Sequence, residues 1–199
     1  MVVWLWSMLL VSYAVQESRG SSVIGFGACP QPPVQQNFDV NQYTGVWYEY
    51  KRFPVPYEFL VTCAEARYDV LNASAISVTN TGIRDITMHT LYRNKTQANG
   101  VATIPDPSVP AKLVVTLVDS VCPGIARGNY WVLDTDYATF SLVYSCFSII
   151  PDFLHYDSAW ILTRDRGVAP GNIDALYRLL TNTTSIPQLL YKPKQLRRH

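Results

Sequence analysis

Residues 37–48 read Asn-Phe-Asp-Val-Asn-Gln-Tyr-Thr-Gly-Val-Trp-Tyr, and this stretch decides the fold. An Asx residue opens a short turn, aromatic and aliphatic side chains recur through it, and Gly45 precedes a strand-like run. A glycine two residues before Trp47, at the entrance to a first strand, suits a helical turn that caps one end of a barrel. Glycine lets the backbone pack closely there while the indole ring fills the base.

The first fourteen residues are predicted to be a secretory signal peptide. Residues 2–11 form an apolar run that only Ser7 interrupts, and Ser12 and Ala14 are small residues at the minus-three and minus-one positions of a cleavage site. A run of about ten residues is too short to span a bilayer. We therefore expect a secreted, extracellular protein, with cleavage after residue 14 or as late as about residue 20.

Length and composition indicate one ordinary globular domain. The chain has 199 residues, of which 48% are hydrophobic and 16% are charged, and its formal net charge is +1. We expect residues 21–199 to form a single domain with a sizeable core and a short basic tail over residues 192–199. A net charge near zero gives no reason to expect nucleic acid or another polyanion as a partner.

Short runs rich in Val, Ile and Thr, separated by turns, favour strands. Eight strands are expected, and the end of the third is left open because the polar residues 93–100 follow it. Their positions are 47–52, 63–71, 76–80 (the start of the third), 101–104 (the end of the fourth), 112–119, 130–133, 139–146 and 159–163. This spacing predicts an all-β fold, an eight-stranded antiparallel up-and-down β-barrel.

An α-helix is expected after the last strand. Pro170 and Asn172 introduce residues 173–180, in which four apolar side chains recur at helical spacing on one face: Ile173, Leu176, Tyr177 and Leu180. This C-terminal helix is expected to pack on the barrel wall.

Three short motifs mark the ends of the expected strands. They are Gly45-Val46-Trp47 at the first strand, Thr135-Asp136-Tyr137 after the sixth and Arg164 at the end of the eighth. Together with longer stretches such as Leu142-Val-Tyr-Ser-Cys146, they make the chain similar to the lipocalin family, in its apolipoprotein D-like branch. The resemblance implies that these motif residues are structural and close one end of the barrel.

The position of Arg164 supports this comparison physically. It lies four residues after Trp160 on a strand whose side chains alternate, so both side chains face the same way. An arginine placed there can stack its guanidinium on the Trp47 indole at the barrel floor. One end of the barrel is therefore expected to be closed and the other open.

An eight-stranded barrel has room for about one small ligand. On the second strand, Ala64, Ala66 and Tyr68 share the face that is expected to point inward. On the eighth strand, Trp160 and Leu162 share the inward parity of Arg164.

The sixth strand leaves a choice, because either Tyr130 or Trp131 must face the cavity. The resemblance implies that Tyr68 and Trp160 line the ligand pocket. The alternative is that these aromatic residues only fill the core. The predicted ligand-binding residues are Tyr68, Trp160, Ala66, Leu162 and Trp131.

The resemblance implies a carrier of a small hydrophobic ligand such as a fatty acid, a steroid or another lipid. A pigment protein that holds biliverdin or a carotenoid is the first alternative. No further cofactor and no metal site are expected, and each of His89, His155 and His199 is expected to be a surface or loop residue. A lipid isomerase that uses an unpaired cysteine is the weaker alternative, and we expect no enzyme activity.

Four cysteines behind a signal peptide indicate two disulfides. The resemblance implies the pair Cys29–Cys146. It does not supply the second pair, because Lys192 stands where the family has a cysteine in the tail. Cys63 and Cys122 remain, and both follow odd-numbered strands, so a bridge across the open rim is topologically possible.

Two surface features complete the expectations. Asn72, Asn94 and Asn182 each begin an N-glycosylation acceptor sequence. The expected loops 53–60 and 147–154 are unusually apolar and lie at the open end. They are predicted to form a mouth that docks on lipid particles, a membrane surface or a partner; the alternative is a lid that folds over the cavity.

Overall fold

A computed structural model describes residues 24–52, 61–85, 93–118 and 127–186. The expected signal peptide, the loop 53–60, Cys122 and the basic tail lie outside the described residues. Within these ranges one nine-stranded sheet is accompanied by two helices. The elements are β1 (Ile24–Phe26), α1 (Val40–Tyr43), β2 (Gly45–Arg52), β3 (Val61–Asn72), β4 (Ala75–Asp85), β5 (Arg93–Thr103), β6 (Lys112–Leu117), β7 (Arg127–Thr135), β8 (Phe140–Ile150), β9 (Leu154–Thr163) and α2 (Ile173–Thr183).

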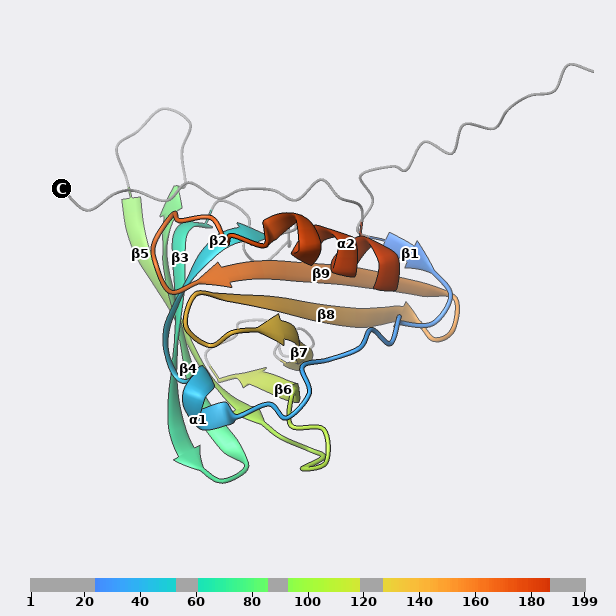
Figure 1. Ribbon diagram of the computed structural model, residues 1–199, viewed down its shortest axis with the longest axis horizontal. Helices are drawn as coiled ribbons and strands as arrows, with labels where there is room; N and C mark the ends of the chain where they lie inside the picture. Colours follow the sequence, from blue (N-terminus) through green and yellow to red (C-terminus); the bar gives the residue numbers. More distant parts are fainter. Residues whose placement is uncertain (1–23, 53–60, 86–92, 119–126, 187–199) are drawn as a thin grey trace, which may run out of the picture.

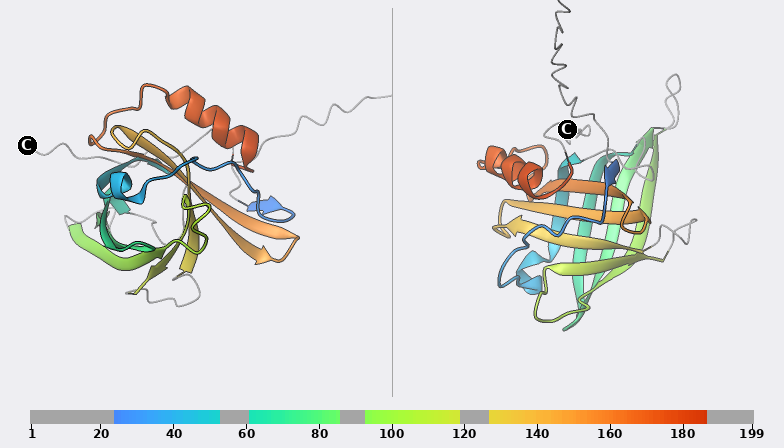
Figure 2. Two further views of the ribbon diagram at one scale, coloured as in Figure 1. Left: turned by 60° about the horizontal axis from the view of Figure 1, so that its bottom comes forward. Right: turned by 90° about the vertical axis from the view of Figure 1, so that its right-hand side faces the viewer.

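The strands β2 to β9 form a closed antiparallel barrel (Figures 1 and 2). Consecutive strands pair with one another, and β9 pairs with both β8 and β2, which closes the sheet on itself. The short β1 adds to the start of β9 outside this ring. The predicted eight-stranded up-and-down barrel is therefore confirmed. Among the described residues, no helix combines the length and the apolar character needed to cross a membrane.

The third and fourth strands are longer than the sequence indicated. The polar residues 93–100 belong to β5, which pairs with β4 at every position from Ala75↔Thr103 to Asp85↔Arg93. Along this strand Lys95 and Gln97 are exposed, while Thr96 and Ala98 are partly buried. Both faces of β5 carry small or polar side chains, so the sequence lacks the alternation of apolar and polar residues by which a strand is predicted.

The apolar segment 147–154 is a hairpin and was wrongly expected to be a loop. The strand β8 continues to Ile150 and β9 begins at Leu154, so only residues 151–153 form the turn, with Asp152 at φ 57°. Figure 2 shows this hairpin projecting from the barrel. Phe140 pairs with Thr163 at the Arg164 end, so the hairpin turn lies at the opposite, open end.

The helix α2 lies along the outside of the barrel, over β9 (Figure 1). Leu176, Tyr177 and Leu180 are its buried residues, which is the face expected from the sequence. Lys51, on the outer face of β2, donates to the Tyr177 hydroxyl, and its ammonium lies 4.8 Å from the centre of that ring. The predicted C-terminal helix on the barrel wall is thus confirmed.

The stretch 37–48 forms the closed end. Asp39 caps α1 by accepting a hydrogen bond from the Asn41 amide, and the Trp47 indole donates to the Tyr43 carbonyl at 2.8 Å. Gly45 has φ +95°, and a Cβ atom there would lie 3.2 Å from the Arg164 guanidinium. The positive φ favours glycine because L side chains rarely adopt that backbone conformation, and a Cβ atom would also press against the arginine.

Arg164 joins the segments that meet at this end. Its guanidinium carbon lies 3.7 Å from the centre of the Trp47 ring, which is the stacking that the sequence analysis expected. Its nitrogens donate to backbone carbonyls of α1, β2 and the β7–β8 turn; the shorter bonds go to Thr44 (2.8 Å), Val46 (2.9 Å) and Tyr137 (3.0 Å). One side chain thereby satisfies carbonyl groups from three parts of the chain.

The motif Thr135-Asp136-Tyr137 builds the turn that receives Arg164. One oxygen of Asp136 accepts from the amides of Ala138, Thr139 and Phe140 at 3.1, 2.7 and 3.0 Å. Burial acts to raise the pKa of Asp136, but the hydrogen bond from the Thr139 hydroxyl and these amide bonds together outweigh it and lower the pKa, so the carboxylate stays charged. Tyr137 adopts φ 63°, and its hydroxyl accepts from the Asp39 amide at 3.0 Å.

Replacing Arg164 tests how much stability this contact supplies. Arg164→Gln removes the stacking and leaves several carbonyls without a donor, so the free energy of unfolding is expected to fall by about 3 kcal/mol. Urea denaturation measures it. Arg67→Gln is the control, because the Arg67 side chain is 59% exposed, and it should change stability by less than about 0.5 kcal/mol. Equal effects of the two substitutions would contradict this account of the closed end.

Candidate functional site

The barrel encloses a cavity of about 240 Å³ above the closed end. Strands β2 to β9 all contribute to its wall. The residues that line it are Glu49, Val61, Ala64, Glu65, Ala66, Tyr68, Val78, Asn80, Thr81, Gly82, Arg84, Thr96, Ala98, Val115, Leu117, Gly128, Asn129, Tyr130, Ser145, Trp160 and Leu162.

A chain of hydroxyl groups connects the cavity wall with the barrel floor. The Tyr68 hydroxyl donates to the Tyr130 hydroxyl at 2.9 Å, and Tyr43 lies 2.9 Å from both the Tyr130 and the Ser141 oxygen atoms. Burial raises the pKa of Tyr43 to about 12, and burial together with the neighbouring tyrosines raises that of Tyr130 well above 10.0. The Tyr43 and Tyr130 hydroxyls therefore stay protonated at neutral pH, and Tyr130 is a polar but uncharged part of the wall.

The rest of the wall combines apolar surface with small side chains. Ala64 and Ala66 on β3 and Ala98 on β5 leave the interior open, while Val78, Val115 and Leu162 make it apolar. Trp160 supplies the largest flat surface. Such a cavity is suited to an apolar ligand of which most of the surface becomes buried.

An ion pair is buried in the wall on β2. Arg52 and Glu49 have side chains that are 4% and 6% exposed, and their nearest nitrogen and oxygen atoms are 3.1 Å apart. Arg52 also donates to the Val61 carbonyl at 2.6 Å. A register shift after Glu49 turns Lys51 outward to α2 and lets Arg52 reach back to Glu49.

The structure brings together four of the five residues that were predicted to bind ligand. Tyr68, Ala66, Trp160 and Leu162 line the cavity, and their role in ligand binding stays a prediction. Trp131 does not line it, so that placement is corrected. Side chains alternate along β7, and Tyr130 takes the inward position. Trp131 faces outward, where the Lys112 ammonium lies 4.2 Å from its ring centre and Tyr144 packs against it.

Strands β4 and β5 also contribute to the cavity wall, which was not predicted from the sequence. Val78, Asn80 and Gly82 follow one another at intervals of two along β4, and Thr96 and Ala98 do so along β5. This spacing of two residues is the pattern of a strand with one face directed inward, and it is present in the sequence. It was obscured because glycine, threonine and asparagine do not read as inward-facing residues.

The disulfide Cys29–Cys146 is present, with an S–S distance of 2.01 Å and Cα atoms 5.9 Å apart. It ties the N-terminal arm to β8, as the resemblance implied. Cys63 is buried at φ 53° on β3 and is not among the residues that line the cavity. Its predicted partner Cys122 lies outside the described residues, so the second bridge stays a prediction.

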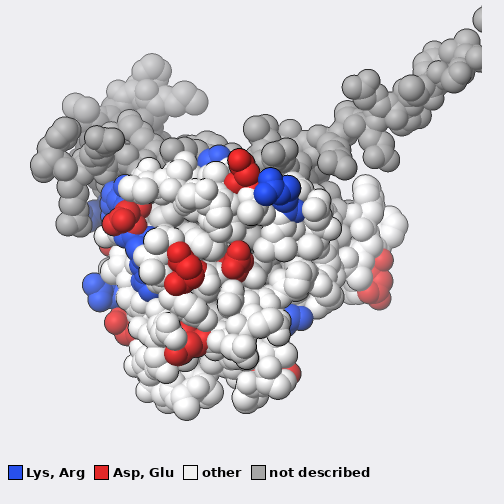
Figure 3. Space-filling model, viewed as in Figure 1, with Lys and Arg blue, Asp and Glu red and all other residues white. Residues whose placement is uncertain are grey.

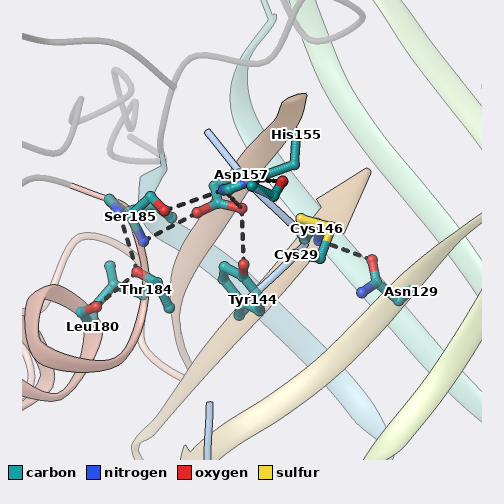
Figure 4. A network of polar contacts seen from close by, with 11 residues as sticks. Cys29, Asn129, Tyr144, Cys146, His155, Asp157, Leu180, Thr184 and Ser185 are labelled. Atoms are coloured by element: carbon teal, nitrogen blue, oxygen red, sulfur yellow. Dashed lines mark hydrogen bonds and ion pairs between the residues drawn. A yellow bond between two sulfur atoms is a disulfide. The ribbon is translucent and has the colours of Figure 1, made fainter. Parts of the chain in front are cut away.

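A second cluster of polar groups lies on the other side of the sheet, where both ends of the described chain meet β8 and β9 (Figure 4). Asp157 accepts from the Tyr144 hydroxyl at 2.8 Å and from the Ser185 amide at 3.2 Å. His155 lies 2.9 Å from the Gly27 carbonyl through Nδ1 and 3.1 Å from the Ser185 hydroxyl through Nε2. A Cβ atom on Gly25 would collide with His155 and Ser185, so β1 covers the cluster closely.

This cluster is structural and lacks the ligands for a metal ion. Cys146, His155 and Asp157 offer atoms within 4.8 Å of one another, but the Cys146 sulfur is bonded to Cys29. The two remaining ligands are fewer than the roughly three that a catalytic zinc site takes from protein. His155 is 1% exposed, which corrects the expectation of a surface or loop residue, because it holds two chain segments together on β9.

The three predicted glycosylation acceptors are all exposed. Asn72 ends β3, and its side-chain oxygen accepts from the Ser74 amide at 2.9 Å. Asn94 lies on β5 and Asn182 near the end of α2. Their occupancy by glycans stays a prediction.

Fold and cavity together define the chain as an up-and-down β-barrel with one closed end and an interior suited to a small molecule. A family model described as a lipocalin-like domain matches residues 38–185. The chain belongs to the lipocalin family.

Known proteins agree with this assignment. The chain is 38% identical over 183 residues to apolipoprotein D of Cavia porcellus, covering 92% of this chain and 88% of that protein. It is 40% identical over 156 residues to apolipoprotein D of Oryctolagus cuniculus, covering 78% of this chain and 76% of that protein. The crystal structure of lobster apocrustacyanin A1 has a TM-score of 0.64 and 21% identity over 81% of this chain and 84% of that one, which shows a shared fold.

Asp157 predicts a pH dependence of stability. Burial, the largest cause, raises its pKa above the usual value, so the folded state binds the proton more tightly than the unfolded state. Protonated Asp157 therefore stabilises the folded protein at a pH below the pKa that this residue has in the unfolded chain. This stabilisation is lost as the pH rises through the higher pKa of Asp157 in the folded protein. Asp157→Asn imitates the protonated acid and should therefore gain stability relative to the native protein as the pH is raised from acid to neutral.

Urea unfolding at several pH values measures this difference. Asp69→Asn is the matched control, because the Asp69 side chain is 58% exposed. Parallel stability curves for Asp157→Asn and the native protein would show that Asp157 carries no such proton linkage.

Proposed function

We propose that the protein is a secreted carrier that binds one small hydrophobic molecule in the barrel cavity. The observation that carries the proposal is the cavity itself, closed below by Trp47 and Arg164 and lined largely by apolar and small side chains. The apolipoprotein D relatives, matched over most of their length, support it.

Binding is expected to work by partition. Each Å² of apolar ligand surface removed from water contributes about 25 cal/mol, so an elongated hydrocarbon gains affinity along its whole length. The hydroxyl groups of Tyr68 and Tyr130 at the wall fix the orientation of a polar atom on the ligand. This mechanism needs no cofactor besides the ligand.

Two features support export from the cell. Disulfides persist in oxidising compartments, and Cys29 and Cys146 are joined by one. The apolar N-terminal residues have the pattern of a signal peptide. The exposed acceptor asparagines would carry glycans after passage through the secretory pathway.

A chromophore carrier uses the same chemistry with a different ligand, a bilin or a carotenoid. An absorption band in the visible range from protein purified from its source would identify it. The thiol-dependent isomerase has less support, because in the described part of the chain no cysteine side chain lines the cavity.

Trp160 tests the cavity as the binding site. Trp160→Ala should weaken binding of the fluorescent apolar probe N-phenylnaphthylamine by about tenfold, since the indole supplies a large flat part of the wall. Trp131→Ala is the matched control, because it removes the same side chain from the outer face. If both folded variants bind the probe like the native protein, the ligand does not lie against Trp160.

A lipid surface is the second proposed partner, through five exposed apolar side chains that we call the hairpin tip. They gather where β1 meets the β8–β9 hairpin at the open end, and Phe26 packs edge-on against Phe153 at 6.2 Å. On the face shown in Figure 3, most of the surface is uncharged and the acidic and basic residues do not gather into one large patch of either sign, which favours an uncharged partner. The members are Phe26 (81% exposed), Phe147 (56%), Ile149 (45%), Ile150 (48%) and Phe153 (60%).

The alternative of a lid has less support for this segment. The four hairpin members are exposed, and none of them lines the cavity. The other apolar segment, residues 53–60, lies outside the described residues.

Replacing Ile149 and Phe153 with Ser should reduce co-flotation with phosphatidylcholine liposomes severalfold, because it removes apolar surface that would insert between lipids. Leu71→Ser is the control, since Leu71 is 55% exposed at the opposite end of the barrel. Flotation that is unchanged in the double variant would remove the hairpin tip as a lipid contact.

A further inference from the structure

We propose that a ligand passes between a lipid surface and the cavity sideways, through an opening in the barrel wall between β7 and β8. The inference rests on the proposed carrier function and goes further, because it assigns the route of entry and the residue that closes it. We call this opening the β7–β8 seam, and it lies between residues 127–130 of β7 and residues 145–150 of β8.

The two strands that border the seam separate towards the open end. They pair from Thr135↔Ser141, near the closed end, as far as Trp131↔Tyr144. Beyond this point residues 127–130 pair with β6, and residues 145–150 run along β9. No ladder pair joins these two described segments to each other. Figure 2 shows the β8–β9 hairpin leaving the barrel here, so the wall is not a continuous sheet at this place.

The side chain of Asn129 joins the two edges of the seam. Its Oδ1 atom accepts from the Cys146 amide and from the Ser145 hydroxyl, both at 2.9 Å. Figure 4 shows Asn129 reaching from its own strand towards Cys146. A side chain can leave such bonds by changing its rotamer, whereas two paired strands must separate along their length. The contact that closes the seam can therefore open locally.

The cavity extends to the seam. Gly128, Asn129 and Ser145 all line the cavity, and Gly128 is also exposed at the surface. Apart from its chain neighbours, the nearest atom to a Cβ placed on Gly128 would be the Ser145 Oγ atom, at 3.9 Å. The edges of the seam thus carry small side chains, and a turn of Asn129 to one side widens the opening.

An apolar surface leads from the seam to the hairpin tip. Side chains alternate along β8, so Phe147 lies on the face of that strand that carries Ser145. Phe147 pairs with Tyr156 on β9, which in turn pairs with Ile24 on β1. Phe147 is 56% exposed and Ile24 is 45% exposed. An apolar chain that leaves a bilayer at the hairpin tip can follow this face into the seam with little of its surface in water.

The mouth of the barrel offers the other route, from water, and the two routes differ in their kinetics. A ligand that first dissociates into water transfers at a rate set by its release from the lipid, whatever the protein concentration. Transfer at the seam needs a collision between protein and lipid surface, so its rate rises in proportion to the protein concentration.

Phosphatidylcholine vesicles loaded with cis-parinaric acid and a quenching lipid separate the two routes. The fluorescence of the acid rises as it moves from the vesicle to the protein. With the native protein in excess, we expect the rate constant of transfer to increase in proportion to the protein concentration. Loading of N-phenylnaphthylamine from water measures the equilibrium affinity of each variant separately.

Asn129→Leu keeps the size of the side chain but cannot accept a hydrogen bond, so it should speed transfer from vesicles by at least about fivefold. Asn129→Asp keeps the acceptor oxygens and should bring the rate back towards the native value. Gly128→Leu fills the seam and should slow transfer severalfold, by more than it weakens binding of N-phenylnaphthylamine.

Gly171→Leu is the matched control for Gly128→Leu. A Cβ atom on Gly171 would meet no atom within 4 Å, and the residue precedes α2 on the outside of the barrel. This control should leave the rate of transfer unchanged.

Two results would overturn the inference: a rate constant that does not depend on the protein concentration, or a concentration-dependent one that neither Asn129→Leu nor Gly128→Leu changes. A native protein that takes up neither cis-parinaric acid nor N-phenylnaphthylamine from water would instead contradict the proposed carrier function and the inference with it.

Discussion

The contact between the Arg164 guanidinium and the Trp47 ring is the constraint on which the rest of the structure depends. A barrel of eight strands has two ends, and a ligand cavity needs one of them closed. Arg164 closes it by stacking on the indole and donating to carbonyls of α1, β2 and the β7–β8 turn. Gly45 leaves space for this arginine, and Asp136 shapes the turn that receives it.

Closure at one end leaves the other end free for function. Around the open end lie Arg84 at the mouth, the β8–β9 hairpin and the apolar hairpin tip. Outside the barrel, α2, the disulfide and the Asp157 cluster fasten the helix and the N-terminal arm to β8 and β9. The contacts of Arg164 therefore hold the closed end together, while the disulfide and the Asp157 cluster fasten the N-terminal arm and the end of α2 beside the hairpin nearer the open end.

Much of this architecture could be predicted from the sequence, because short motifs with strict geometric needs mark it. Side chains alternate along β9, so every second residue before Arg164 was expected to face inward. This correctly placed Trp160 and Leu162 on the cavity wall. The same counting could not choose between Tyr130 and Trp131, because both are large aromatic residues and β7 had no fixed reference point.

Other features depended on tertiary contacts that local sequence does not express. The polar β5 is a strand because β4 pairs with it along its whole length. His155 is buried because two distant segments cover it, and Glu49 faces the cavity beside an arginine three residues away because of a bulge in β2. Each of these depends on pairing partners or register shifts, which periodicity alone does not reveal.

The central claim is that the barrel cavity holds one small hydrophobic molecule. Native mass spectrometry of the protein purified from its source tests this claim most directly, with organic extraction of whatever is bound. We predict a complex of one chain with one apolar molecule, displaced by N-phenylnaphthylamine. A chain with no bound small molecule, which also gains no adduct when incubated with excess hexadecanoic acid, would contradict the account.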